Sequence, residues 1–362
     1  MSEPTETAPA VGGEAGFTPL AEAAKRLGYA AEDWRAAARV FPVRWPEHYL
    51  RLGEGDDGAA IRKMGVPAVA ELTPDPGDLA DPVGEQGLLD GPCLVRKHPD
   101  RALLLVTARC HFYCRFCFRR SHPAGAHRDP TREQLDDALG LIRNDPRVRE
   151  VILSGGDPLV LSDERLAEIV AAVADIDHVE TLRVHSRAPV HHPQRVTPEL
   201  AALLAGGKPA WLVTHFNNAR ELTEESEQAL GLLRAAGLSL LNQTVLLSGV
   251  NDSRDELVAL FSGLYRRGIK PYYLHHPDRA PGNAAFRVSL RRGRELYRDV
   301  RGRLPGPAMP SYVIDLPDGS GKVPVLELLD LGNGAWQAPG RPEPFQDIPD
   351  TEDERPTETP ST

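Results

Sequence analysis

The chain of 362 residues carries a formal net charge of -10, and 41% of its residues are hydrophobic. This length and composition can supply a sizeable core in one or two domains, and the acidic balance argues against a nucleic-acid backbone as the main partner. No stretch approaches the roughly 20 apolar residues that a membrane helix needs, so no membrane partner is expected.

The two ends of the chain are predicted to be disordered tails. Residues 1–16 contain almost no large apolar side chain, and residues 337–362 are rich in Pro, Glu, Asp and Thr, a composition that cannot build a packed core. After the first tail, short helical patterns at 20–27 and 34–40 are joined by loops rich in Asp, Gly and Pro. We interpret residues 17–96 as an N-terminal helical collar, in which the sequence indicates no chemistry.

Short β-rich runs and amphipathic helical patterns alternate in the middle of the chain. The six runs are 103–107, 151–154, 182–185, 211–214, 240–245 and 272–274. Apolar residues recur with a period of 3.6 between them, for example at Leu135, Leu139 and Ile142. Asp129 is predicted to cap that helix. Repeated strand–helix units of this length predict an α/β fold, a partial (β/α)6 barrel of the TIM type over residues 97–305, with a doubly wound open sheet as the alternative.

Three cysteines within eight residues, Cys110, Cys114 and Cys117, have the spacing CxxxCxxC. Thiolates this close can bind three irons of one cubane cluster and leave the fourth iron open to another ligand. This spacing is typical of radical S-adenosylmethionine enzymes, in which S-adenosylmethionine is that ligand. The non-enzyme alternative is a zinc-stabilised binding module, completed by His111 or His122. Because only one further cysteine and no signal-peptide pattern are present, we expect clustered thiols in a reducing cytoplasm rather than disulfides.

Polar motifs lie at or after the carboxyl ends of successive predicted strands, except that Asn242-Gln243 lies within the fifth strand. They are Gly155-Gly156-Asp157-Pro158, His185-Ser186-Arg187, Thr214-His215-Phe216-Asn217, Asn242-Gln243 and His275-His276-Pro277-Asp278. In a barrel this edge carries the catalytic residues, so we expect one shared site there together with the cysteine loop. Each motif alone is weak, since Gly155-Gly156, for instance, could form only a tight turn.

The cysteine loop and these motifs, in this order, resemble the lysine 2,3-aminomutase family of radical S-adenosylmethionine enzymes over roughly residues 83–330. The resemblance implies three cofactors, namely a 4Fe-4S cluster on the three cysteines, S-adenosylmethionine and pyridoxal 5'-phosphate. The residues that it places on S-adenosylmethionine are Gly155, Gly156, Asp157, Pro158, Ser186 and His215.

A glycine-rich loop near the C terminus contains Lys322, and its glycines would let the backbone approach a bulky cofactor. By itself, a lysine in such a loop is usually a solvated turn residue. The family resemblance implies instead that Lys322, in a C-terminal segment at 306–336, is the catalytic lysine that forms the internal aldimine with pyridoxal phosphate. The further cofactor contacts that it implies are Lys97 and Arg101 for the phosphate, with hydrogen bonds from Asn242 and Gln243.

Similarity to the family also implies a substrate with a cationic side chain. Arg119 matches the position that binds the amino-acid carboxylate, for which a guanidinium offers a planar fork. Asp278 and Asp315 match the positions that bind the distal ammonium of lysine, where a distal carboxylate would be repelled. The structural alternatives are a salt bridge at the barrel rim for Arg119 and a turn cap for either aspartate.

The resemblance therefore implies an isomerase that moves the 2-amino group of L-lysine to carbon 3, through an imine with pyridoxal phosphate and a 5'-deoxyadenosyl radical. It also implies an electron donor such as flavodoxin or ferredoxin, and a homo-oligomer. The sequence differs from the lysine-degrading members of the family in two features. Lys97 stands where an arginine is expected, and no cysteine follows Cys117. The alternatives are a β-lysine-forming enzyme that serves elongation factor P, an aminomutase for another amino acid, and a radical enzyme without pyridoxal phosphate.

Overall fold

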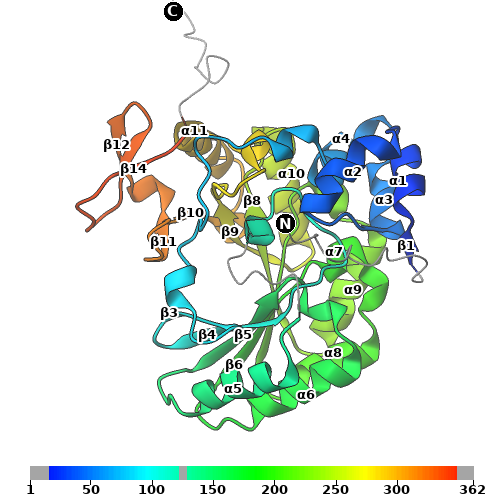
Figure 1. The fold of residues 1–362 in the computed structure, drawn as a ribbon, viewed down its shortest axis with the longest axis vertical. Coiled ribbons are helices and arrows are strands. Elements are labelled where there is room, and N and C mark those ends of the chain that lie inside the picture. The colour runs from blue at the N-terminus through cyan, green and yellow to red at the C-terminus, as the bar shows by residue number, and fades with distance from the viewer. Residues whose placement is uncertain (1–15, 122–128, 349–362) are drawn as a thin grey trace, which may run out of the picture.

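The computed structural model describes residues 16–121 and 129–348. Residues 1–15 and 349–362 of the predicted tails lie outside this part of the chain, and so does His122. Figure 1 shows the described part as a central sheet with helices around it.

A nine-stranded sheet forms the centre of the molecule, in the order β11-β10-β9-β8-β7-β6-β5-β4-β3. Seven neighbouring strands run parallel: β4 (Arg101–Thr107), β5 (Glu150–Gly155), β6 (Thr181–His185), β7 (Ala210–Thr214), β8 (Ser239–Val245), β9 (Lys270–His275) and β10 (Ser311–Asp315). The antiparallel edge strands are β3 (Leu94–His98) and β11 (Lys322–Pro324). The six predicted strands are β4 to β9, so the partial barrel is confirmed, and three further strands extend it.

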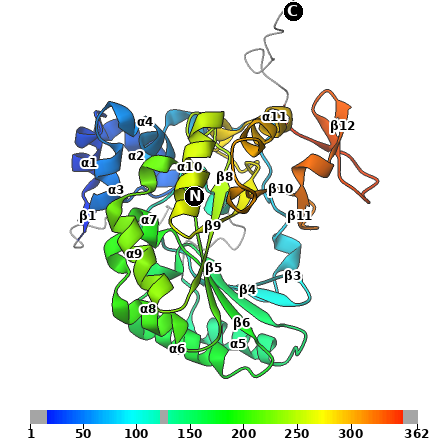
Figure 2. The ribbon, with the colours of Figure 1, turned by 180° about the vertical axis from the view of Figure 1, so that it is seen from behind.

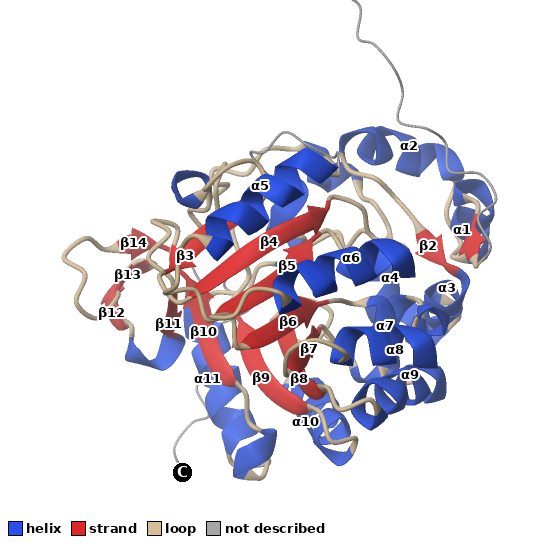
Figure 3. Cartoon of the chain, turned by 90° about the horizontal axis from the view of Figure 1, so that it is seen from below, coloured by secondary structure: helices blue, strands red, loops and turns tan. Residues whose placement is uncertain are grey.

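Helices cover the outer face of this curved sheet (Figure 3). The long ones are α5 (Arg132–Arg143), α6 (Asp163–Ala174), α8 (Pro198–Ala205), α9 (Glu224–Ala235), α10 (Arg254–Arg266) and α11 (Leu290–Arg301), and α7 (Ala188–His191) is a single turn after β6. Their apolar stripes, such as Leu135, Leu139 and Ile142 of α5, are buried and form the main core with the sheet. No helix in the described residues is long and apolar enough to cross a membrane.

Each of the six long helices begins after a Ser or Thr whose side chain accepts a hydrogen bond from the third helical residue. The cap of α5 is Thr131, which accepts from Gln134 N, so the prediction of Asp129 as the cap is wrong. Asp129 instead accepts hydrogen bonds from Thr107 Oγ1 at 2.6 Å and from Ala108 N at 2.9 Å. It thereby ties the chain before α5 to the end of β4, where the cysteine loop begins.

The N-terminal segment packs on the cysteine loop at one end of the sheet (Figures 1 and 2). It contains α1 (Leu20–Arg26), α2 (Ala31–Val40), α3 (Glu47–Gly53), α4 (Ala59–Gly65) and a small sheet of β1 (Phe17–Thr18) and β2 (Trp45–Pro46). The ring of Phe112, in the cysteine loop, lies 5.0 Å from the ring of Trp45 and 4.6 Å from that of Tyr49. The boundary predicted at residue 96 falls inside β3, which belongs to the central sheet.

A second small sheet follows β11 and corrects the predicted start of the C-terminal tail. It consists of β12 (Leu329–Gly332), β13 (Ala335–Gln337) and β14 (Phe345–Gln346). The buried ring of Trp336 lies 5.3 Å from the guanidinium of Arg294, and Asp347 accepts a hydrogen bond from Leu290 N at 2.6 Å. These contacts attach the segment to α11, so the prediction of a tail is wrong for residues 337–348.

Candidate active site

A cavity of about 500 Å³ lies at the carboxyl ends of the parallel strands. The predicted site residues that line it are Lys97, Arg101, Cys110, Cys114, Cys117, Arg119, Gly155, Gly156, Asp157, Ser186, His215, Gln243, Asp278, Asp315 and Lys322. Pro158 and Asn242 are not part of this lining. The fold therefore brings the cysteine loop and the strand-end motifs together in one cavity.

The cysteine loop places three half-buried thiols at the cavity wall. Burial raises the pKa of all three thiols, and that of Cys114 reaches about 11. Arg187 Nη1 donates a hydrogen bond to Cys114 Sγ at 2.7 Å and so favours the thiolate. Bound iron would favour the thiolates far more, because a metal ion is a strong local positive charge.

The three thiols are the candidate ligands of a metal cluster, and zinc is the alternative. In the part of the chain that the structure describes, no three His, Cys, Asp or Glu side chains are grouped so that they could hold a single metal ion. His111, a candidate zinc ligand, packs against the rings of Phe17 and His192, with ring centroids 6.1 and 5.3 Å away.

Gly155 and Gly156 close the turn after β5 against the start of the cysteine loop. Gly155 has a φ of +115°, and a Cβ at this position would lie 2.2 Å from Thr107 O. A Cβ on Gly156 would lie 2.2 Å from Arg109 O. Any side chain at either position would therefore push the cysteine loop away from β5. This close backbone packing is a structural reason for the glycine pair, beside any contact with a cofactor.

Asp157 follows the two glycines, and its carboxylate contacts the chain just after the next strand, β6. Its carboxylate accepts hydrogen bonds from Ser186 Oγ at 2.6 Å, Leu159 N at 3.0 Å and Arg187 N at 3.0 Å. Burial raises the pKa of Asp157, although these bonds favour its charged form. Pro158 is buried in the turn η5 (Pro158–Val160), away from the cavity. Its contact with S-adenosylmethionine stays a prediction.

Asp315 and Lys322 face each other across the β10–β11 ladder. Lys322 Nζ lies 3.1 Å from Asp315 Oδ2, Lys97 Nζ lies 3.3 Å from Oδ1, and His275 Nδ1 lies 3.7 Å from Oδ2. Burial acts to raise the pKa of Asp315. The hydrogen bond with His275 and the charges of the two lysines outweigh burial and hold this pKa well below its usual range. Asp315 is therefore ionised at neutral pH and holds Lys322 at the cavity.

Asp278 follows β9 and lines the same cavity, but its pKa is shifted in the opposite direction to that of Asp315. Burial and the charge of Asp315 raise the pKa of Asp278 to about 8, although Lys322 and Lys97 oppose this shift. The environment therefore favours the protonated form of Asp278 and the charged form of Asp315. A cation bound between the two carboxyl groups would favour the release of that proton, because it would stabilise a second negative charge.

Arg119 forms a bidentate ion pair in the cavity wall. Its Nη1 lies 2.5 Å from Glu85 Oε2 and its Nη2 lies 2.9 Å from Glu85 Oε1, and both side chains are largely buried. This planar fork is the geometry that suits a carboxylate, and Glu85 occupies it in the structure. A substrate carboxylate at Arg119 must displace Glu85 or share the guanidinium with it. No sequence motif marks Glu85, which reaches Arg119 across 34 positions of the chain.

Known proteins with similar sequences cover most of this chain. The Radical SAM superfamily model matches residues 104–261. The L-lysine 2,3-aminomutase of Clostridium subterminale is 42% identical over 280 residues, which are 77% of this chain and 67% of that protein. The putative L-lysine 2,3-aminomutase of Aquifex aeolicus (strain VF5) is 38% identical over 306 residues, which are 83% and 82% of the two chains. The chain belongs to the lysine 2,3-aminomutase family.

The family is not restricted to lysine as a substrate. The glutamate 2,3-aminomutase of Clostridioides difficile (strain 630) is 34% identical over 286 residues, which are 78% of this chain and 68% of that protein. As a member of the lysine 2,3-aminomutase family, the chain is an isomerase of the radical S-adenosylmethionine type that acts on an amino acid. The family's cofactors are a 4Fe-4S cluster, S-adenosylmethionine and pyridoxal 5'-phosphate.

The lysine 2,3-aminomutase cofactors fit the residues of this cavity. Three thiols are available to a cluster, Lys322 offers an amine, and Arg101 and Lys97 offer positive charge to a phosphate. The Nε2 atoms of His185 and His275 are buried without a hydrogen-bond partner among the described residues, and both rings line the cavity. Because buried polar atoms are nearly always paired, these two nitrogens point to a bound molecule that supplies the missing partners.

Of the two amides assigned to pyridoxal phosphate, only Gln243 lines the cavity. Asn242 Oδ1 accepts a hydrogen bond from Phe216 N at 2.7 Å, and Asn242 Nδ2 donates to Thr244 Oγ1 at 2.9 Å. Its side-chain amide is thus bound to the chain after β7 and to its own strand, and Asn242 is not among the residues that line the cavity. Asn242 therefore braces the chain after β7, and its hydrogen bond to pyridoxal phosphate stays a prediction.

Proposed function

We propose that this family member converts L-lysine into β-lysine by moving the 2-amino group to carbon 3. The observation that carries the proposal is the presence of Asp278 and Asp315 in the same cavity as Arg119 and Lys322. The cavity thereby offers a guanidinium to the α-carboxylate, an amine to the cofactor and two carboxyl groups to a distal ammonium. A basic amino acid uses all of these groups. Use of the β-lysine to modify elongation factor P is compatible with the same chemistry.

In this proposal Cys110, Cys114 and Cys117 hold the cluster, and the groups around S-adenosylmethionine are Gly155, Gly156, Asp157, Ser186 and His215. When bound, the cluster and S-adenosylmethionine supply a radical that removes a hydrogen atom, and pyridoxal phosphate supplies the carbonyl that carries the migrating amino group. The chain's own residues fix where these groups meet. Because they project from the ends of packed strands, they hold the reacting groups in set positions. A flavodoxin or ferredoxin would supply the electron, and the assembly would be a homo-oligomer.

Lys322 is the residue that we propose to bind pyridoxal phosphate covalently, with Arg101, Lys97 and Gln243 around it. Asp315 is shared by Lys97 and Lys322 in the structure. A substrate ammonium must therefore replace at least one of these lysines to pair with Asp315. Attachment of the cofactor to Lys322 and attraction of Lys97 by the phosphate would both release Asp315 for the substrate.

Glutamate is the second candidate substrate. Lys97 favours it, because an ammonium inside the cavity can pair with a distal carboxylate. Against glutamate stand two carboxyl groups, Asp315, which is ionised, and Asp278, which a further negative charge would keep protonated. A distal carboxylate beside them would be repelled or left poorly paired. The balance of these charges favours lysine.

A product assay tests the proposal. Protein reconstituted anaerobically with iron, sulfide and pyridoxal phosphate is incubated with S-adenosylmethionine, a reductant and either L-lysine or L-glutamate. We expect mass spectrometry to detect β-lysine, with turnover of glutamate much slower, and no product without the reductant. Faster turnover of glutamate would overturn the lysine proposal while leaving the radical chemistry in place.

Replacing Asp278 or Asp315 with asparagine is expected to weaken the use of lysine. Loss of one charged partner of a desolvated ammonium costs about 2 to 5 kcal/mol, so kcat/KM for lysine should fall by roughly 30- to 5000-fold. A neutral analogue of the same length should lose much less in Asp278→Asn, whereas Asp315→Asn should also impair the analogue in part, because Asp315 holds Lys322 at the cavity. Arg119→Lys is the matched comparison, because it should impair both substrates alike through their common carboxylate. Unchanged lysine kinetics in both aspartate variants would remove these residues from the substrate site.

A further inference from the structure

Arg187 connects a cysteine of the cluster loop to a buried carboxylate. It follows β6, and only 8% of it is exposed. Its Nη1 donates to Cys114 Sγ at 2.7 Å, its Nε to His215 O at 2.8 Å and its Nη2 to Glu221 Oε1 at 2.8 Å. Because three groups on different segments of the chain bind it, the guanidinium is fixed between the thiol and the carboxylate.

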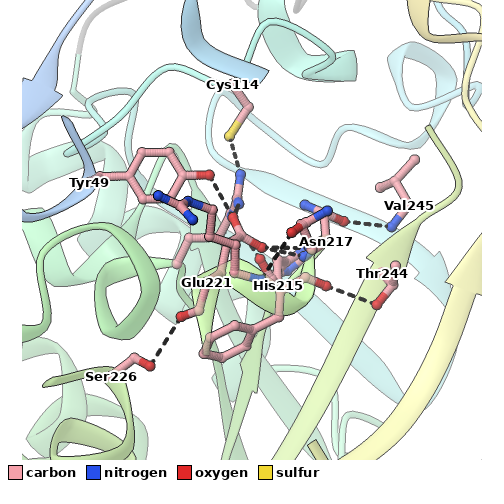
Figure 4. Close-up of polar contacts among 12 residues, drawn as sticks. Tyr49, Cys114, His215, Asn217, Glu221, Ser226, Thr244 and Val245 are labelled. Atoms are coloured by element: carbon pink, nitrogen blue, oxygen red, sulfur yellow. Dashed lines mark hydrogen bonds and ion pairs between the residues drawn. The ribbon is translucent and has the colours of Figure 1, made fainter. Parts of the chain in front are cut away.

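Glu221 is fully buried and is held by the collar as well as by the barrel. Its carboxylate accepts hydrogen bonds from Tyr49 Oη at 2.6 Å, Asn217 N at 2.5 Å and Asn218 N at 3.0 Å. Figure 4 shows Tyr49 and Cys114 on different sides of this cluster of polar contacts, with Glu221 within it. Tyr49 belongs to α3, so three successive contacts, through Glu221 and Arg187, connect a helix for which the sequence indicates no chemistry to Cys114.

We propose that Arg187 and Glu221 form a charge pair that sets the reduction potential of the iron–sulfur cluster, and that Tyr49 fixes this pair from the collar. The inference rests on the proposed role of Cys114 as a cluster ligand. Reduction adds one electron to the cluster, and the potential responds to nearby charge and to hydrogen bonds on the sulfurs. A guanidinium that donates to the ligand sulfur stabilises the reduced form, whereas the carboxylate behind it offsets that effect.

Burial makes the effect of this pair strong. Arg187, Glu221 and Tyr49 are all less than a tenth exposed, so water and salt screen the two charges weakly. Removal of either member leaves the charge of the other uncompensated next to Cys114. Neutralising Arg187 and neutralising Glu221 should therefore shift the potential in opposite directions. A general loss of packing would not produce this pattern. Opposite shifts of the reduction potential therefore distinguish an electrostatic role of Arg187 and Glu221 from a purely structural one.

Potentiometric titration of the reconstituted full-length protein, followed by electron paramagnetic resonance of the reduced cluster, tests the proposal. Arg187→Gln should move the midpoint to a more negative potential. At the wild-type midpoint the ratio of reduced to oxidised cluster should fall about tenfold, which corresponds to about 59 mV for one electron. Glu221→Gln should shift the midpoint by a similar amount in the positive direction. Arg187→Lys retains the charge and should recover part of the loss.

Tyr49→Phe provides a second test in case Glu221→Gln does not fold. It removes one hydrogen bond from the carboxylate and concentrates the negative charge there, so it should shift the potential in the same direction as Arg187→Gln, but less. Tyr297→Phe is the matched control, because it removes a hydroxyl that donates to Pro310 O at 2.8 Å, and it should leave the potential unchanged.

Iron and sulfide content separates the possible failures. If the wild-type protein binds no cluster after reconstitution, the proposed role of the three cysteines is wrong. If all variants bind the cluster equally and their potentials coincide, the cysteine assignment stands and the charge-pair proposal is wrong. A shift in the same direction for Arg187→Gln and Glu221→Gln would also overturn it.

Discussion

Alanine at Cys110, Cys114 or Cys117 is expected to abolish the cleavage of S-adenosylmethionine. Each substitution removes one of the three protein ligands that the cavity offers to the cluster, and two thiolates hold a cubane poorly. The measurement is the amount of 5'-deoxyadenosine that the anaerobically reconstituted protein forms with dithionite, together with its iron and sulfide content.

Cys93→Ala is the matched control for these variants. Cys93 is buried outside the cavity, and its thiol donates to Gln134 O at 3.3 Å. The variant should retain about four irons and four sulfides per chain, and most of the cleavage activity. Stoichiometric zinc without iron, found after anaerobic expression and reconstitution, would contradict the assignment of the cysteine loop to a cluster.

Lys322→Arg is expected to lower the rate of amino transfer by a factor on the order of 10³ or more. Arginine keeps a positive charge near Asp315, but its guanidinium does not form the covalent bond to the cofactor carbonyl that a neutral lysine amine forms. Borohydride reduction of the reconstituted wild-type protein, followed by peptide mapping, should find the phosphopyridoxyl group on Lys322.

Two other lysines make this prediction specific. Lys97 lies in the same cavity, whereas Lys208 donates to Ile176 O at 3.2 Å and is not among the residues of the cavity lining. Lys208→Arg should therefore leave both the label and the rate unchanged. A label on Lys97 or Lys208, or no label at all in wild-type protein reconstituted with the cofactor, would show that Lys322 is not the cofactor lysine.

The barrel core could be predicted because its signals are local. The helical period of residues such as Leu135, Leu139 and Ile142 depends only on the neighbouring sequence, and parallel strands place their carboxyl ends at one edge. That rule alone brings Cys110 and Asp278, which are far apart in the chain, to the same cavity. The position of each motif along its strand is therefore sufficient to predict most of the residues of the candidate site.

The parts that sequence analysis missed depend on contacts between distant segments. Glu85 reaches Arg119, and Glu221 joins Tyr49 to Arg187, without any spacing rule that connects these positions. The three-stranded sheet after β11 is stabilised by tertiary contacts with α11 in a segment whose composition resembles a disordered tail. The contacts of Asn242 with Phe216 likewise join residues that are 26 positions apart in the chain.

The β10–β11 ladder makes the proposed cofactor lysine and one of the proposed substrate carboxylates directly opposed neighbours, with Asp315 paired to Lys322 in register. A side chain on a strand changes face with every position, so a slip of one residue between these strands would turn Lys322 out of the cavity while leaving the fold nearly intact. The turn at 316–321 is itself restricted in sequence, because Gly319 and Gly321 have φ values of +77° and +114°, and a Cβ on Gly319 would lie 2.5 Å from Gly84 O. A short hairpin of fixed register would thus couple the proposed substrate recognition by Asp315 to the proposed cofactor attachment at Lys322.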